Sequence, residues 1–195
     1  MIKNVCVFAS SCNYLEDIYY KEAAEFGELL SKSGFNMVYG GSSLGLMWAC
    51  AEKVKQNGAK IIGVMPEKLY NMGVSTDKCV ELTVTKGMRE RKAKMDEISD
   101  AVVALAGGFG TLEELSEMIV QKQLGYNDKA IVLLNTNGFY DKLIEFFENI
   151  IAQNFARNSA RELYYIAQTP FDAVEYLKNY VPKNLAISKV DIYSR

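Results

Sequence analysis

The chain has 195 residues, of which 49% are hydrophobic and 24% are charged, and its formal net charge is −2. This length and composition fit one globular domain with one core, predicted over residues 1–182, followed by a C-terminal tail over residues 183–195. The nearly balanced charge excludes a general attraction to nucleic acid. A membrane span and a signal peptide are also not expected, so a cytoplasmic location is predicted.

Strand and helix patterns alternate along the sequence. Short apolar runs bounded by turn residues predict strands over residues 5–9, 36–39, 60–64, 79–84, 101–105, 130–134 and 163–167. Apolar residues at helical spacing predict helices over residues 16–32, 44–56, 88–98, 111–124, 139–153 and 170–180, with a loop or short helix over residues 67–77. This alternation predicts an α/β fold, a doubly wound parallel sheet with helices on both faces.

Three loops of small or hydroxyl residues follow predicted strands at the carboxyl edge of this sheet. They span residues 10–11, 40–43 and 107–111, after the first, second and fifth strands. Ligands of open α/β sheets bind beyond the carboxyl ends of the strands, so these loops are the predicted ligand site.

The strongest local signal is the run GGFGTLEE at residues 107–114, between an apolar strand and an amphipathic helix. Its glycines let the backbone approach an anion, the helix start offers unpaired N–H groups, and Thr111 can donate its hydroxyl to a phosphate oxygen. The alternative is a structural turn in which Thr111 caps the helix and Glu114 completes a capping box. The run is neither a P-loop nor a G-x-G-x-x-G fingerprint, which disfavours ATP hydrolysis and NAD chemistry.

Two weaker signals accompany this run. The sequence GGSS at residues 40–43 is a second turn before a predicted helix, and a purely structural turn is an equal alternative. In the predicted helix over residues 88–98, one face carries Met88, Arg91, Lys92 and Met95. An inward arginine there could clamp a phosphate or a ribose, whereas the alternative is the solvated face of a charged helix.

The chain contains no histidine and four cysteines, none of them in a C-x-x-C pair. A metal site is therefore not expected. Cys6 and Cys50 lie in apolar segments and are expected to be buried free thiols in a reducing cytosol. Without histidine, catalysis must use carboxylates, arginine, lysine, tyrosine or backbone donors.

Three motifs together resemble the LONELY GUY (LOG) family. The family pattern P-G-G-x-G-T-x-x-E matches residues 106–114, with Ala106 in place of the proline. The pattern M-H-E-R-K matches residues 88–92, with Arg89 in place of the histidine, and Y-G-G-G-x-x-G-L-M-G matches residues 39–48 with two departures. Members of this family are cytokinin riboside 5′-monophosphate phosphoribohydrolases and related bacterial nucleotide nucleosidases, often mislabelled as lysine decarboxylases.

The resemblance implies a Rossmann-like fold, a homodimer with active sites near the interface, and catalytic roles for Arg91 and Glu114. It implies an enzyme that hydrolyses the N-glycosidic bond of a nucleoside 5′-monophosphate, AMP or an N6-substituted cytokinin nucleotide, to free base and ribose 5-phosphate. No metal, cofactor, nucleic acid or membrane is expected to take part. The alternative is a non-catalytic protein that binds or carries a nucleotide or a nucleotide-like cofactor.

The other predicted site residues are expected to hold the substrate and its phosphate. They are Ser10, Gly40, Gly41, Met88, Lys92, Gly107, Gly108, Phe109, Gly110, Thr111 and Glu113. Glu114, one turn into the helix, would stabilise the positive charge that develops on the ribose. Gly87, Arg89 and Val120 depart from the residues common in the family, so the pocket for the base is where a difference from cytokinin-activating enzymes is expected.

Overall fold

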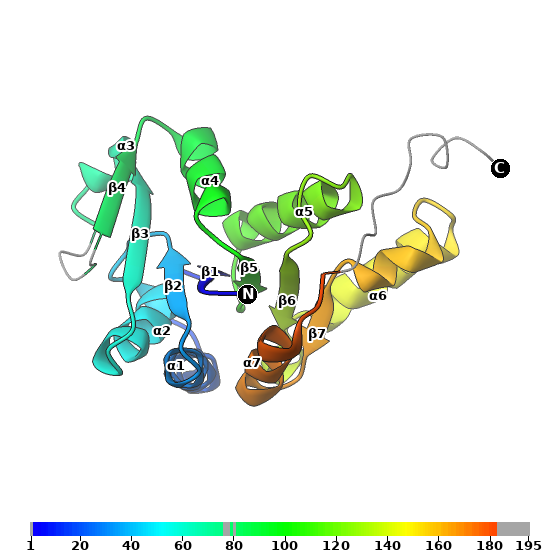
Figure 1. The fold of residues 1–195 in the computed structure, drawn as a ribbon, viewed down its shortest axis with the longest axis horizontal. Helices are drawn as coiled ribbons and strands as arrows, with labels where there is room; N and C mark the ends of the chain where they lie inside the picture. Colours follow the sequence, from blue (N-terminus) through cyan, green and yellow to red (C-terminus); the bar gives the residue numbers. More distant parts are fainter. Residues whose placement is uncertain (1, 76–78, 80, 183–195) are drawn as a thin grey trace.

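In the computed structural model, which describes residues 2–75, 79 and 81–182, seven strands form one sheet (Figure 1). The strands are β1 (Asn4–Phe8), β2 (Asn36–Tyr39), β3 (Ile61–Pro66), β4 (Glu81–Thr85), β5 (Ala101–Ala104), β6 (Ala130–Leu134) and β7 (Tyr165–Ala167). Their spatial order is β4-β3-β2-β1-β5-β6-β7, and each neighbouring pair is parallel. The predicted α/β fold with a parallel sheet is confirmed.

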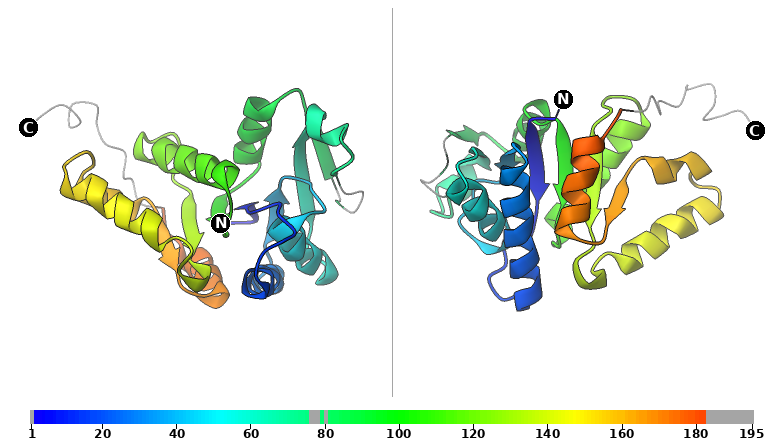
Figure 2. Two further views of the ribbon diagram at one scale, coloured as in Figure 1. Left: turned by 180° about the vertical axis from the view of Figure 1, so that it is seen from behind. Right: turned by 60° about the horizontal axis from the view of Figure 1, so that its bottom comes forward.

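Helices follow the strands and cover both faces of the sheet (Figures 1 and 2). They are α1 (Asp17–Lys32), α2 (Gly45–Gln56), α3 (Glu67–Tyr70), α4 (Met88–Glu97), α5 (Phe109–Gln123), α6 (Asp141–Ala152) and α7 (Pro170–Asn179), with 3₁₀ helices η1 (Thr136–Gly138) and η2 (Asn158–Glu162). One face packs against α1, α2 and α7, and the other against α4, α5 and α6. In the described part of the chain, no helix has both the length and the apolar character of a membrane span.

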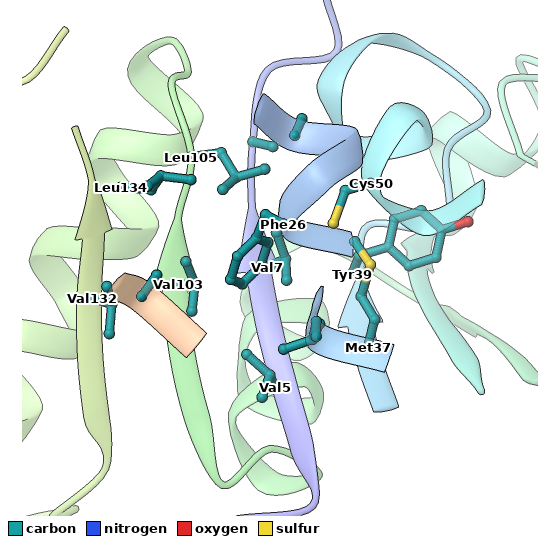
Figure 3. Close-up of a cluster of buried hydrophobic side chains, with 14 of the residues drawn as sticks. Val5, Val7, Phe26, Met37, Tyr39, Cys50, Val103, Leu105, Val132 and Leu134 are labelled. Atoms are coloured by element: carbon teal, nitrogen blue, oxygen red, sulfur yellow. The ribbon is translucent and has the colours of Figure 1, made fainter. Parts of the chain in front are cut away.

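Side chains of β1 alternate between the two cores, as the two-residue period of a strand requires. Val5 and Val7 join the cluster that also contains Phe26 of α1 and Cys50 of α2, shown in Figure 3. Cys6 lies on the opposite face, in the cluster beneath α4, α5 and α6. Cys6 and Cys50 are buried free thiols, as the sequence predicted.

Two helices begin two residues away from their predicted first residue. The helix predicted over residues 111–124 begins two residues earlier, at Phe109. The helix predicted over residues 139–153 begins only at Asp141, after a turn in which Asn137 has a φ of 51°. The backbone N–H of Tyr140 donates to the Asn135 side chain at 2.8 Å, which fixes this turn before α6.

Two further predicted segments include residues that the structure does not describe. The strand predicted over residues 79–84 corresponds to β4, and residue 80 lies outside the described part. The C-terminal tail predicted over residues 183–195 also lies outside it. The strand predicted over residues 163–167 begins two residues later, at Tyr165, because η2 and the turn after it occupy the preceding segment.

The strand order reverses between β1 and β5, which lie side by side at the centre of the sheet. From β1 the connections run outward on one side to β4, and from β5 they run outward on the other side to β7. The loops that leave β1 and β5 therefore separate and leave a crevice at the carboxyl edge. The backbone N–H of Ser10 donates to the Ala106 carbonyl at 3.1 Å, which joins the two loops at the base of the crevice.

Candidate nucleotide site

A cavity of about 420 Å³ lies at this crevice. Its walls come from the end of β1 and the loop after it, from α2, α3 and α4, and from the first turns of α5. The residues that line it are Val7, Phe8, Ala9, Ser10, Ser11, Cys12, Met47, Leu69, Met88, Arg91, Gly108, Gly110, Thr111 and Glu114. A single cavity thus joins the loops after β1 and β5 with the charged helix α4.

A buried ion pair lies in the wall of this cavity. Arg91 Nη1 donates to Glu114 Oε1 at 2.5 Å, and each residue is only 8% exposed. The Arg91 Nε–H donates to the carbonyl of Val64 in β3, at 3.1 Å. These bonds hold the guanidinium between two elements, so its position is fixed before any ligand binds.

Glycine at position 40 makes room for this guanidinium. A Cβ atom at Gly40 would lie 2.8 Å from Arg91 Nη2 and 3.1 Å from Met47 Sδ. Both distances are below ordinary van der Waals contact, so a side chain here would displace Arg91 or Met47. The glycine after β2 therefore positions the arginine of α4.

Burial and the neighbouring Arg91 act in opposite directions on the pKa of Glu114. Burial raises the pKa of the Glu114 carboxyl above its usual range, while the charge and hydrogen bond of Arg91 lower it. Burial is the larger effect. A carboxyl whose pKa is raised toward neutrality can accept a proton from water and can also stabilise a cation when it is ionised.

The N-terminus of α5 opens onto the same cavity. The helix begins at Phe109 with Gly108 as its N-cap, and its first backbone bond runs from the Leu112 N–H to the Gly108 carbonyl at 3.0 Å. The N–H groups of the three residues before Leu112 therefore have no acceptor within the helix. Gly108, Gly110 and Thr111 line the cavity, so this turn can bind an anion.

The capping alternative for this segment is wrong. Thr111 is the third residue of α5 rather than its N-cap, and its N-cap residue is Gly108. The Glu114 carboxylate bonds to Arg91 of α4 and so does not complete a capping box. The reason is that the helix starts two residues earlier than the pattern indicated, so Thr111 lies inside its first turn and not at the N-cap position.

Comparisons with known proteins decide the family. A family model described as "Possible lysine decarboxylase" matches residues 47–177. The chain is 40% identical over 182 residues to the probable cytokinin riboside 5′-monophosphate phosphoribohydrolase LOGL2 of Oryza sativa subsp. japonica, across 93% of this chain and 75% of that protein. It is 38% identical over 181 residues to the cytokinin riboside 5′-monophosphate phosphoribohydrolase LOG of the same organism, again across 93% and 75%.

The chain belongs to the LOG family. The resemblance seen in its motifs is thus confirmed. Among solved structures, the molybdenum cofactor binding protein of the phototrophic bacterium Rippkaea orientalis aligns with a TM-score of 0.70, at 23% identity, over 91% of this chain and 96% of that chain. That alignment shows a shared fold.

The cavity of this LOG-family chain contains seven of the residues predicted from sequence. They are Ser10, Met88, Arg91, Gly108, Gly110, Thr111 and Glu114. Gly40 lies behind the Arg91 guanidinium, and Gly41, with a φ of +71°, packs against Leu82 of β4. Gly107 packs against Thr111, because a Cβ there would lie 2.1 Å from the Thr111 hydroxyl oxygen.

Three further predicted residues, Lys92, Glu113 and Phe109, do not line the cavity either. Lys92 pairs with Glu113 and also with Glu117, at 2.5 Å from Glu117 Oε2. Phe109 is 91% exposed. Val120, expected from the family near the substrate, instead lines an apolar groove between α5 and α6.

Leu69 and Cys12 line the cavity but were not predicted. Leu69 belongs to α3, a four-residue helix in the segment predicted as a loop or short helix, and nothing in the sequence connects it to the site. Cys12 follows Ser10 and Ser11 directly, so its position in the loop after β1 was the signal that could have found it. Among the described residues, no group of Cys, Asp or Glu is arranged to hold a metal ion.

Proposed function

We propose that this chain hydrolyses the N-glycosidic bond of a nucleoside 5′-monophosphate, AMP or an N6-substituted AMP, to release the base and ribose 5-phosphate. The observation that carries the proposal is the buried Arg91–Glu114 pair in one cavity with the open N-terminus of α5. The activity for which the plant relatives are named agrees with this prediction from sequence.

The first turn of α5 is the proposed phosphate site. The backbone N–H groups of this turn, the positive end of the helix dipole and the Thr111 hydroxyl all suit a phosphate dianion. Ser10, across the crevice in the loop after β1, adds a hydroxyl group to the same cavity. Binding the phosphate here leaves the ribose to extend toward Arg91 and Glu114.

Glu114 is the proposed catalytic carboxylate. Breaking the bond between C1′ and the base nitrogen builds positive charge on the ribose, which a buried carboxylate stabilises. The ionised carboxylate then accepts a proton from the water that attacks C1′ and passes that proton to the departing base nitrogen, so Glu114 ends the turnover ionised again. Arg91 holds Glu114 in place and can donate to the ribose or phosphate, which orients C1′.

Apolar side chains form the proposed wall for the base. Met47, Leu69 and Met88 come from three different helices and line the cavity. Long unbranched methionine side chains adapt to substituents of different shape. This wall supports AMP and N6-substituted AMP as the substrates to compare first.

A homodimer in the cytoplasm is the proposed state of the enzyme. Large apolar side chains are exposed on α5 and α6, among them Phe109, Val120 and Phe146. A groove between the two helices is lined by Ile119, Phe147 and other apolar residues. Such exposure is typical of a surface that binds another protein, and light scattering of the purified chain tests whether the partner is a second copy.

The enzymatic test compares nucleotides with nucleosides. Purified protein is incubated with AMP, N6-isopentenyl-AMP, GMP, CMP and the matching nucleosides, and free base and ribose 5-phosphate are quantified by chromatography. Release from a monophosphate but not from its nucleoside supports the proposal. No release from any of them, with AMP still binding, contradicts it and favours the carrier alternative.

Substitutions of Arg91 and Glu114 test the catalytic roles proposed for these two residues. Glu114→Gln keeps the shape but removes the carboxylate, so kcat is expected to fall by at least about 100-fold while AMP still binds. Arg91→Ala is expected to lower kcat similarly. Glu97→Gln, on the exposed surface of α4, is the matched control and retains wild-type turnover. Full turnover by Glu114→Gln would rule out the assigned role.

A further inference from the structure

Lys92 lies next to Arg91 in sequence, yet its ammonium group has a different environment. It pairs with both Glu113 and Glu117 of α5, and its side chain is 19% exposed. The two glutamates are four residues apart and so lie on one face of α5. Glu114, the proposed catalytic residue, lies in the turn between them.

A second, much smaller cavity locates Lys92 relative to Glu114. This cavity, of about 20 Å³, is lined by Lys92, Glu114, Glu117 and residues of β1, β5, α4 and α5. Glu114 also lines the nucleotide cavity, whereas Lys92 does not. Lys92 therefore shares a small cavity with Glu114 but lies outside the cavity that would hold the proposed substrate.

The same contacts join two helices that come from distant strands. The helix α4 follows β4 at one edge of the sheet, and α5 follows β5 at its centre (Figure 1). Two adjacent cations of α4 reach three carboxylates of α5, Arg91 to Glu114 and Lys92 to the two glutamates beside it. The position of Arg91 against Glu114 thus depends on how α4 is held to α5.

We propose that Lys92 is a positioning residue that holds α4 to α5 and keeps the Glu114 carboxylate charged, rather than a ligand of the substrate phosphate. This inference rests on the proposed hydrolase function. Lys92 neutralises Glu113 and Glu117, whose negative charges would otherwise oppose ionisation of Glu114. The positive charge of Lys92 also lowers the pKa of the Glu114 carboxyl directly.

The charged and titratable groups around Glu114 are consistent with this role. They are Arg91, Lys92 and Asp96 from α4, Cys6 from β1, and Glu113 and Glu117 from α5 itself. Burial raises the pKa of the Cys6 thiol to about 12, so Cys6 stays neutral, and Asp96 is paired with Lys129. Arg91 and Lys92 both lower the pKa of Glu114, and Glu113 raises it.

The test is the pH dependence of turnover in Lys92→Met. If Lys92 keeps Glu114 charged, the acid limb of the kcat profile moves to higher pH, and kcat falls about tenfold below the limb for each pH unit of that movement. The KM for AMP on the alkaline side of the limb stays near its wild-type value. Lys92→Arg, which keeps the charge and the reach, leaves the limb near its wild-type position.

Removing the neighbouring carboxylates gives a second, sharper outcome. In Lys92→Met/Glu113→Gln/Glu117→Gln the two charges that Lys92 neutralises are gone, so the acid limb returns toward the wild-type pH. A raised KM for AMP with an unmoved limb, and no rescue by the two glutamine substitutions, would overturn the proposal and assign Lys92 to the phosphate. Lys94→Met, which breaks an exposed ion pair with Glu97 on the same helix, is the matched control.

One readout does not depend on turnover. The pKa of Glu114 is followed by NMR in protein labelled with carboxyl-¹³C glutamate, with the signal assigned by its loss in Glu114→Gln. A rise in this pKa in Lys92→Met supports the inference even if none of the tested nucleotides is hydrolysed. An unchanged pKa overturns it even if the wild-type protein is an active hydrolase.

Discussion

Two glycine-rich loops lie at the same edge of the sheet, and each leads into a helix, but their helix N-termini are used differently. At the start of α2 the N–H of Gly45 donates to the Asn13 side chain at 2.8 Å, and the N–H of Leu46 donates to the Ser10 carbonyl at 2.9 Å. These donors are satisfied by the loop after β1. At the start of α5, by contrast, Gly108 and Gly110 line the nucleotide cavity.

The glycines of the two loops differ in the same way. A Cβ at Gly45 would lie 2.5 Å from the Ser10 carbonyl oxygen, whereas a Cβ at Gly108 or Gly110 would meet nothing within 4 Å. Glycine in the loop after β2 therefore makes room for other parts of the protein. In the loop after β5, Gly107 packs against Thr111, but Gly108 and Gly110 leave space that a ligand can occupy. Similar sequence patterns can thus serve packing in one loop and binding in the other.

The largest effect is expected for Gly45→Ala. The new Cβ meets backbone atoms, which cannot rotate away, and the φ of +59° is unfavourable for alanine. We expect the free energy of unfolding to fall by about 3 kcal/mol, from overpacking and backbone strain together. Urea denaturation followed by circular dichroism measures it.

Gly34→Ala separates the two causes in Gly45→Ala. Gly34 has a φ of +85°, but a Cβ there meets nothing within 4 Å. Its loss should be about 1 kcal/mol, from backbone strain alone. Equal losses in the two variants would show that the close contact with Ser10 contributes nothing.

The next largest effect is expected for Gly40→Ala, and the quantity that changes most is kcat. Its Cβ would press on the ends of the Arg91 and Met47 side chains, which can move, so the stability loss should be about 1 kcal/mol. Displacing the guanidinium from Glu114 is expected to lower kcat about 100-fold. Steady-state kinetics with AMP measures it, and wild-type kcat in a folded Gly40→Ala protein would contradict the positioning role of Gly40.

The pH dependence of the wild-type protein tests the Arg91–Glu114 ion pair, which joins α4 to α5. Burial raises the pKa of Glu114, so the carboxylate is lost by protonation at a higher pH than for an exposed glutamate, whose pKa is about 4.3. Below this raised pKa, kcat/KM should fall about tenfold for each pH unit. Gly40→Ala should move the acid limb further up, because Arg91 lowers this pKa, and a limb at the ordinary glutamate pKa would contradict the burial effect.

The fold was accessible from sequence because its signals are local. Alternating apolar runs and helical periods are properties of single segments, and they located each strand and most helix bounds. The catalytic roles expected of Arg91 and Glu114 came from motifs of the family, whereas the ion pair between them was not predicted. The contacts of Lys92 with Glu113 and Glu117 were not predicted either, because they depend on how two helices from distant strands approach each other. Leu69 was missed for the same reason.

The smallest effect is expected for Gly110→Ala, which separates binding from packing most directly. The added Cβ meets no protein atom within 4 Å, and alanine is favoured over glycine inside a helix, so the free energy of unfolding should rise by about 0.5 kcal/mol. Because Gly110 lines the cavity, the same methyl group crowds the proposed phosphate and should raise the KM for AMP about fivefold, or about 1 kcal/mol. Affinity for adenosine, which lacks the phosphate, should stay unchanged in calorimetry. If Gly110→Ala weakened the binding of adenosine and of AMP equally, the base or the ribose, and not the phosphate, would lie at the N-terminus of α5.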